Sequence, residues 1–142
     1  DVLDQEGIAS LVVFHGVNDI GTAEAAVEEQ ARVTADLVGA YQEIVDRARA
    51  RGIRVHGATL LPFGGNDPYD DPAGRREATR QAVNAWIRGS DRFDAVIDFD
   101  RVVRDRARPG RLRADVDSGD HLHPNATGMQ ALADAVPLAF FR

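Results

Sequence analysis

Two short segments of the chain carry residue types and spacings that suit acid–base chemistry. The C-terminal one runs from Asp117 to Pro124 and holds Asp120 and His123, three residues apart, just before an expected helix. At that spacing the carboxylate can accept a hydrogen bond from the imidazole Nδ1–H, which leaves Nε2 free as a general base. We therefore predict that Asp120 and His123 form a hydrogen-bonded pair, with Asp120 on the Nδ1 side.

The N-terminal segment is G-V-N-D, from Gly16 to Asp19, directly after the most apolar run of the chain. Gly16 permits a tight turn, and the Asn18 amide supplies two donors that can point into a crevice. A plain strand-to-loop turn with a local Asn or Asp hydrogen bond is the alternative interpretation. If both segments serve one site, Asn18 and His123 must meet at the carboxyl end of a sheet.

A second copy of the G-x-N-D pattern lies at Gly64 to Asp67. It sits in a longer loop with a proline on either side, which is more typical of a wall beside a substrate. We expect Asn66 to lie farther from His123 than Asn18 does.

Other interpretations of the 117–124 segment stay open. His121 and His123, together with Asp117 or Asp120, have the donor types of a zinc or iron site, although no third ligand distant in the chain is evident. The segment could also be a structural loop whose aspartate caps the last helix. We predict no metal and no cofactor.

Composition excludes several classes of protein. The 142 residues are of globular composition, with 44% hydrophobic and 28% charged residues. Seventeen arginines, no lysine and 23 acidic residues give a net charge of −6, which argues against a nucleic-acid partner. No cysteine is present, which excludes a disulfide and a cysteine nucleophile within these residues. No apolar run is long enough for a membrane span, so we expect no membrane partner. The acidic start lacks the features of a signal peptide, and a mature secreted chain would look the same.

The order of expected elements predicts an α/β fold. Apolar runs at 8–14, 53–61 and 93–99 suit buried strands, and helical periodicity covers 22–51, 73–89 and 126–136. Thr22 and Asn125 are the expected N-caps, Gly39 allows a break in the first helix, and residues 100–118 are expected to be irregular. Alternating strands and helices predict a three-layer, doubly wound parallel sheet. Three strands are few for such a fold, so the chain is interpreted as the later part of a larger domain.

At this point the sequence resembles the SGNH (GDSL-type) serine hydrolases. The resemblance rests on G-V-N-D at 16–19 and D-x-x-H-P at 120–124, with a similar strand end at 60–63. It implies a flavodoxin-like SGNH hydrolase fold, with Asn18 and Gly16 on the oxyanion or substrate-binding side. It also implies that Asp120 and His123 are the last two members of a Ser-His-Asp triad.

The family's nucleophile block, G-D-S, has no counterpart in this chain. Its three serines are Ser10, Ser90 and Ser118, and none is expected on a strand-to-helix elbow. We therefore interpret residues 1–142 as the C-terminal part of one SGNH-hydrolase-like domain, incomplete at its N-terminal side. A complementary upstream segment or chain would supply the serine. The expected reaction is ester hydrolysis, of the carboxylesterase or carbohydrate deacetylase type; the alternative is a non-catalytic α/β binding or scaffold chain.

Overall fold

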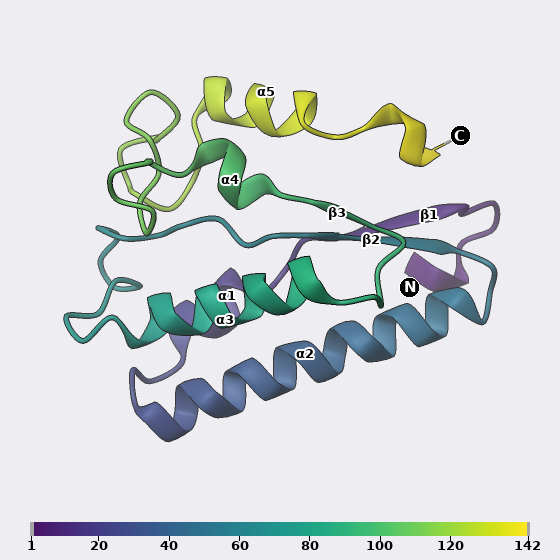
Figure 1. Ribbon diagram of the computed structural model, residues 1–142, viewed down its shortest axis with the longest axis horizontal. Helices are drawn as coiled ribbons and strands as arrows, with labels where there is room; N and C mark the ends of the chain where they lie inside the picture. Colours follow the sequence, from purple (N-terminus) through teal and green to yellow (C-terminus); the bar gives the residue numbers. More distant parts are fainter. Residues whose placement is uncertain (1, 142) are drawn as a thin grey trace.

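The computed structural model describes residues 2–141 and places three parallel strands between two layers of helices (Figure 1). The sheet order is β1-β2-β3, formed by β1 (Ser10–Val13), β2 (Arg54–Ala58) and β3 (Ala95–Ile97). Both strand pairs are parallel, so the predicted parallel α/β sheet is confirmed. The carboxyl ends of the strands therefore share one edge, and the loops that follow them lie together there.

Two long helices cover one face of the sheet. They are α2 (Val27–Arg49) and α3 (Arg75–Gly89), and both lie below the sheet in Figure 1 together with the short α1 (Val17–Thr22). Val45 of α2, Val55 of β2 and Val83 of α3 are fully buried in the core between them. Burial of these aliphatic side chains drives the packing of the helices on the sheet.

The other face has a thinner cover. It consists of α4 (Phe99–Val103) and α5 (Ala126–Asp134), with a 3-10 turn at Leu138–Phe141 following (Figure 1). Val103 and Leu132 pack in a second apolar cluster with Ala58 of β2. Another 3-10 turn, at Val2–Asp4, precedes β1. None of the helices within residues 2–141 has both the length and the apolarity that a bilayer crossing needs.

The segment after β1 differs from the prediction. Residues expected to form a turn form α1, and Thr22 ends this helix instead of capping the next one, because its hydroxyl donates back to the Asn18 carbonyl at 2.7 Å. The long helix α2 begins at Val27 and runs unbroken through Gly39. A Cβ at Gly39 would have open space around it, so packing does not require a glycine at this position.

The region from residue 100 to 118 is also more regular than expected. It begins inside α4, whose N-cap Asp98 accepts a hydrogen bond from the backbone of Arg101, and β3 ends two residues before Phe99. The predicted cap of the last helix is confirmed, since Asn125 Oδ1 accepts from Gly128 N at 3.0 Å. The helix it starts, α5, carries Met129 on its exposed side and buries Leu132.

A buried ion-pair network holds the loop after β2. Arg80 of α3 is fully buried and donates to the Asp100 carboxylate at 2.7 Å and to the Leu60 carbonyl at 2.9 Å. Glu77 accepts two further bonds from the same guanidinium. A buried charge is tolerated only when it is paired in this way, so the network fixes where the chain leaves the sheet.

Candidate active site

Asp120 and His123 lie together as predicted. The Asp120 carboxylate is 2.6 Å from His123 Nδ1, and its other oxygen accepts from the backbone N–H groups of His123 and Leu122 at 2.8 and 2.9 Å. These donors hold the pKa of Asp120 well below its usual range, so the carboxylate stays ionised. The His123 side chain is 72% exposed, which leaves its Nε2 open to a reacting group.

A second pair of the same kind lies in the same loop. His121 Nδ1 is 2.6 Å from the Asp117 carboxylate, which also accepts from the backbone N–H groups of Gly119 and His121. His121 has a φ of 62°, the left-handed region that non-glycine residues seldom adopt. Partial burial opposes ionisation of Asp117, but the three hydrogen bonds outweigh it and lower the pKa.

The loop that carries both pairs is closed at its base. Ser118 N donates to the His123 carbonyl at 3.0 Å, and Asp117 and Pro124 form an isolated antiparallel bridge. Asn125 caps α5 and also donates to the carbonyl of Asp117 at 3.0 Å. Asp120 takes no part in capping α5; its carboxylate stays within the loop. The start of the helix therefore anchors a rigid loop that presents His123.

The G-V-N-D segment begins α1 at the carboxyl end of β1. Gly16 has a φ of 128°, and a Cβ there would lie 2.8 Å from the Tyr41 hydroxyl, so only glycine fits. Asn18 is exposed and borders a small hollow of about 190 Å³ that Gly16 and Leu60 also line. Its Oδ1 accepts from the Tyr69 hydroxyl at 3.0 Å.

The loop after β2 connects the two motifs, and sequence reasoning missed its role. Asn66 is buried and donates through Nδ2 to the Asp120 carbonyl at 2.8 Å, whereas Tyr69 reaches Asn18. The contact with the loop of His123 thus comes from Asn66, in the second G-x-N-D copy. That Asn18 lies nearer to His123 than Asn66 does stays a prediction. The duplicated pattern was the available signal, because it placed a second polar loop at the same edge of the sheet.

The serines of the chain are not placed for attack with His123. Ser118 donates to Asp120 Oδ1 at 2.9 Å, and the Ser10 hydroxyl is buried in β1 without a partner among the described residues. Ser90 follows α3, with its hydroxyl bonded to the backbone of Arg92. Within residues 2–141, no serine is hydrogen-bonded to the His123 ring.

Metal-ligating side chains do not gather in groups of three or more anywhere in residues 2–141. The two histidines of the loop pair with different carboxylates, His121 with Asp117 and His123 with Asp120. Each carboxylate thus contacts a different imidazole, and the two histidines do not share a carboxylate.

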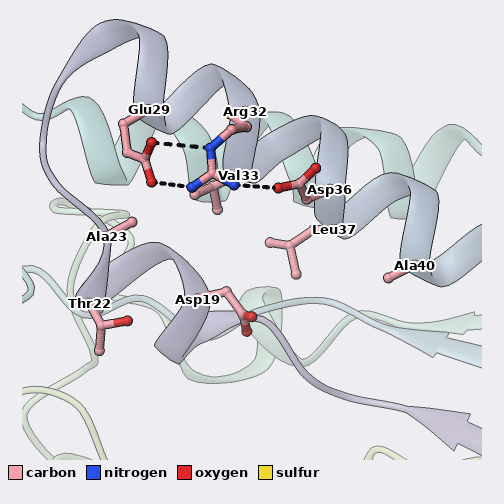
Figure 2. A pocket seen from close by; sticks show the side chains of 9 residues that line it. All are labelled: Asp19, Thr22, Ala23, Glu29, Arg32, Val33, Asp36, Leu37 and Ala40. Atoms are coloured by element: carbon pink, nitrogen blue, oxygen red, sulfur yellow. Dashed lines mark hydrogen bonds and ion pairs between the residues drawn. The ribbon is translucent and has the colours of Figure 1, made fainter.

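A larger cleft of about 420 Å³ lies between α1 and α2 (Figure 2). Arg32 stands on its wall, joined to the carboxylates of Glu29 and Asp36, and Val33 and Leu37 form an apolar floor. Neither Asn18 nor His123 lines this cleft. The candidate site is therefore defined by the hydrogen-bonded loops and not by this cleft.

An imidazole paired with a carboxylate and an exposed amide, both on loops of a parallel α/β sheet, are two of the groups that acyl-transfer sites use. The family model of the GDSL-like lipase/acylhydrolases matches residues 2–131. The chain belongs to this family. A search of curated proteins found no match.

Solved structures share the fold. A GDSL-like lipase (BT0569) from Bacteroides thetaiotaomicron aligns with a TM-score of 0.69 and 17% identity over 94% of this chain and 62% of its own. A protein described as an acylhydrolase (BF3764) from Bacteroides fragilis gives a TM-score of 0.64, 20% identity and coverages of 94% and 61%. A protein described as a platelet activating factor from Streptococcus pneumonia aligns with a TM-score of 0.62 and 19% identity, over 94% of this chain and 59% of its own. This chain thus spans about three fifths of the length of each.

Proposed function

We propose that this chain supplies the base, its orienting carboxylate and an oxyanion donor to a serine esterase. The observation that carries the proposal is the 2.6 Å contact between Asp120 and His123 Nδ1. It favours the tautomer with the proton on Nδ1 and leaves Nε2 as the base. His123 then takes the proton of the attacking serine and returns it to the leaving alkoxide, while the ionised Asp120 stabilises the imidazolium between these steps.

Asn18 is proposed as a donor to the oxyanion. Negative charge develops on the carbonyl oxygen as the tetrahedral intermediate forms, and a preorganised N–H stabilises it. Support comes from the position of Asn18 at the carboxyl edge of the sheet, exposed and beside the hollow at Gly16. Gly16 contributes by allowing the turn that brings Asn18 to this edge.

The serine is proposed to come from a segment upstream of residue 1. Two observations support this: the chain spans about three fifths of its structural neighbours, and β1 pairs with β2 alone, so its other edge is free in the sheet of residues 2–141. An apolar groove of about 390 Å³ runs along that side, lined by Leu3, Leu11 and Ile44 among others. A parallel strand added to β1 would pair its backbone groups and cover the groove.

The substrate is proposed to be a carboxylic ester, either a small acyl ester or an acetyl group on a carbohydrate. Family membership supports ester hydrolysis as the reaction class. Both ester types are proposed by analogy with the family, and assays with the two kinds of substrate distinguish them.

The test compares the 142-residue chain with the same chain extended by its upstream segment, using p-nitrophenyl acetate. We expect hydrolysis by the extended chain that His123→Ala abolishes, and no hydrolysis above the His123→Ala control by the 142-residue chain. Robust His123-dependent turnover by the short chain would show that the nucleophile has been misplaced. An extended chain without any esterase activity would favour the non-catalytic binding or scaffold role.

A further inference from the structure

We propose that Tyr69 is a positioning residue that orients the Asn18 amide toward the oxyanion. The Tyr69 hydroxyl donates to Asn18 Oδ1 at 3.0 Å, across 51 positions of sequence. The inference rests on the proposed function of Asn18 and adds a residue that neither motif contains.

An amide side chain has two chemically opposite ends, and only one of them can stabilise an oxyanion. With Oδ1 held by Tyr69, the Nδ2 group of Asn18 has no hydrogen-bond partner within residues 2–141 and is left to donate. A flipped amide would present its oxygen to the developing negative charge and repel it. With the phenol donating to Oδ1, the amide already has the useful orientation before the substrate arrives.

Tyr69 can do this because its ring is held firmly. The ring lies directly on α1, so close to Gly21 that a Cβ there would be 2.2 Å from Tyr69 Cδ2. Phe63 also packs against the ring in an edge-to-face arrangement, with ring centroids 6.2 Å apart. Gly21 is thus required for the ring to reach Asn18.

The same loop reaches the base. Asn66 Oδ1 accepts from Tyr69 N at 3.4 Å, and Asn66 Nδ2 donates to the Asp120 carbonyl at 2.8 Å. One short loop thus contacts both the oxyanion donor and the Asp120–His123 pair. Such a link would set the spacing between two parts of the site that come from distant parts of the chain.

Activity measurements on the complete protein test the positioning role. We expect Tyr69→Phe, which keeps the ring on Gly21, to lower kcat about 10-fold with KM within about 2-fold, because one neutral hydrogen bond is lost. Asn18→Ala should lower kcat by about 10²–10³, the usual effect of losing an oxyanion donor. In the Asn18→Ala background, Tyr69→Phe should have no further effect. A Tyr69→Phe loss that persists undiminished in that background would overturn the proposal.

A second readout needs no activity. The side-chain amide signals of Asn18, assigned by their loss in Asn18→Asp, are followed by ¹⁵N–¹H NMR in the wild type and in Tyr69→Phe. In Tyr69→Phe we expect the chemical shifts of the Asn18 side-chain amide to move toward those of a free amide. The shifts of Asn84 and Asn125, which donate to backbone carbonyls elsewhere, should not change. Unchanged Asn18 signals would contradict the Tyr69 contact. If the complete protein hydrolyses no ester, the proposed function fails, and the NMR result still decides whether Tyr69 holds Asn18.

Discussion

The two Asp–His pairs of the 117–124 loop share a contact distance and differ in their surroundings. In each pair the carboxylate lies 2.6 Å from Nδ1. The side chain of Asp117 is 11% exposed and that of Asp120 is 45% exposed, and His121 is less exposed than His123. The hydrogen bond alone therefore does not distinguish the two pairs, whereas the exposure of their side chains does.

The inner pair, Asp117–His121, is the more buried one and contacts the rest of its loop. Asp117 accepts from two backbone N–H groups besides His121, and the His121 ring packs beside Gly65, where a Cβ would be 3.3 Å from it. These contacts compensate for the strained φ of His121. The outer pair, Asp120–His123, is the more exposed one, although Asp120 also accepts from two backbone N–H groups and from the Ser118 hydroxyl. Its imidazole extends toward solvent. We infer that Asp117–His121 stabilises the loop and that Asp120–His123 performs the chemistry.

The largest expected effect comes from removing the outer imidazole. His123→Ala should lower kcat/KM of the complete protein for p-nitrophenyl acetate by about 10⁴ or more, since the serine loses its base. The free energy of unfolding should change little, because the side chain is 72% exposed. His121→Ala is the matched control and should retain most of the activity of any molecules that stay folded. Equal losses in the two variants would remove the functional distinction between the pairs.

The next largest effect is expected at the outer carboxylate. Asp120→Asn keeps the size of the side chain but can donate to Nδ1, which favours the wrong tautomer of His123. We expect kcat to fall by about 10²–10⁴ with a small change in KM. Steady-state kinetics across pH measures this, and full activity in Asp120→Asn would contradict the orienting role.

Loss of the inner carboxylate should act on stability instead. Asp117→Ala removes the acceptor of two backbone N–H groups and of the His121 ring, so we expect a loss of about 2 kcal/mol in the free energy of unfolding. Urea denaturation followed by circular dichroism measures it. An unchanged midpoint would show that the loop does not depend on this pair.

Much of the fold could be predicted from the sequence, because it depends on hydrophobic periodicity. The three apolar runs became β1, β2 and β3, and Asn125 caps α5 as expected. Two short helices, α1 and α4, were missed because they are too short for periodicity to reveal. The first of them also depends on the φ of 128° at Gly16. The contact between Asp120 and His123 could be predicted from their spacing alone, because both residues lie within one loop.

Contacts between distant loops could not be predicted. Tyr69 meets Asn18, and Asn66 meets Asp120, because the parallel sheet brings the ends of β1 and β2 to one edge. No local pattern encodes which side chain of the 64–70 loop bridges to which neighbour. The roles of these residues therefore depend on packing, such as that of the Tyr69 ring on Gly21.

The smallest predicted effect is a difference in acid sensitivity. The folded pKa values of Asp117 and Asp120 lie below their ordinary value near 3.8, so the unfolded chain binds protons more readily. Their stabilising contributions are complete above that ordinary value and are lost as the pH falls below it. Thermal melts at pH 7 and pH 3 should show a smaller acid-induced drop in Tm for Asp117→Ala than for the wild type. An identical drop would contradict a lowered pKa of Asp117.

The central claim is that His123, oriented by Asp120, activates a serine that lies outside residues 1–142. The most direct measurement is labelling of the complete protein with a fluorophosphonate, followed by mass spectrometry of the labelled peptide. The account predicts a single labelled serine in the upstream segment, with labelling that His123→Ala abolishes and His121→Ala preserves. Labelling of Ser118, or upstream labelling that survives His123→Ala, would contradict it.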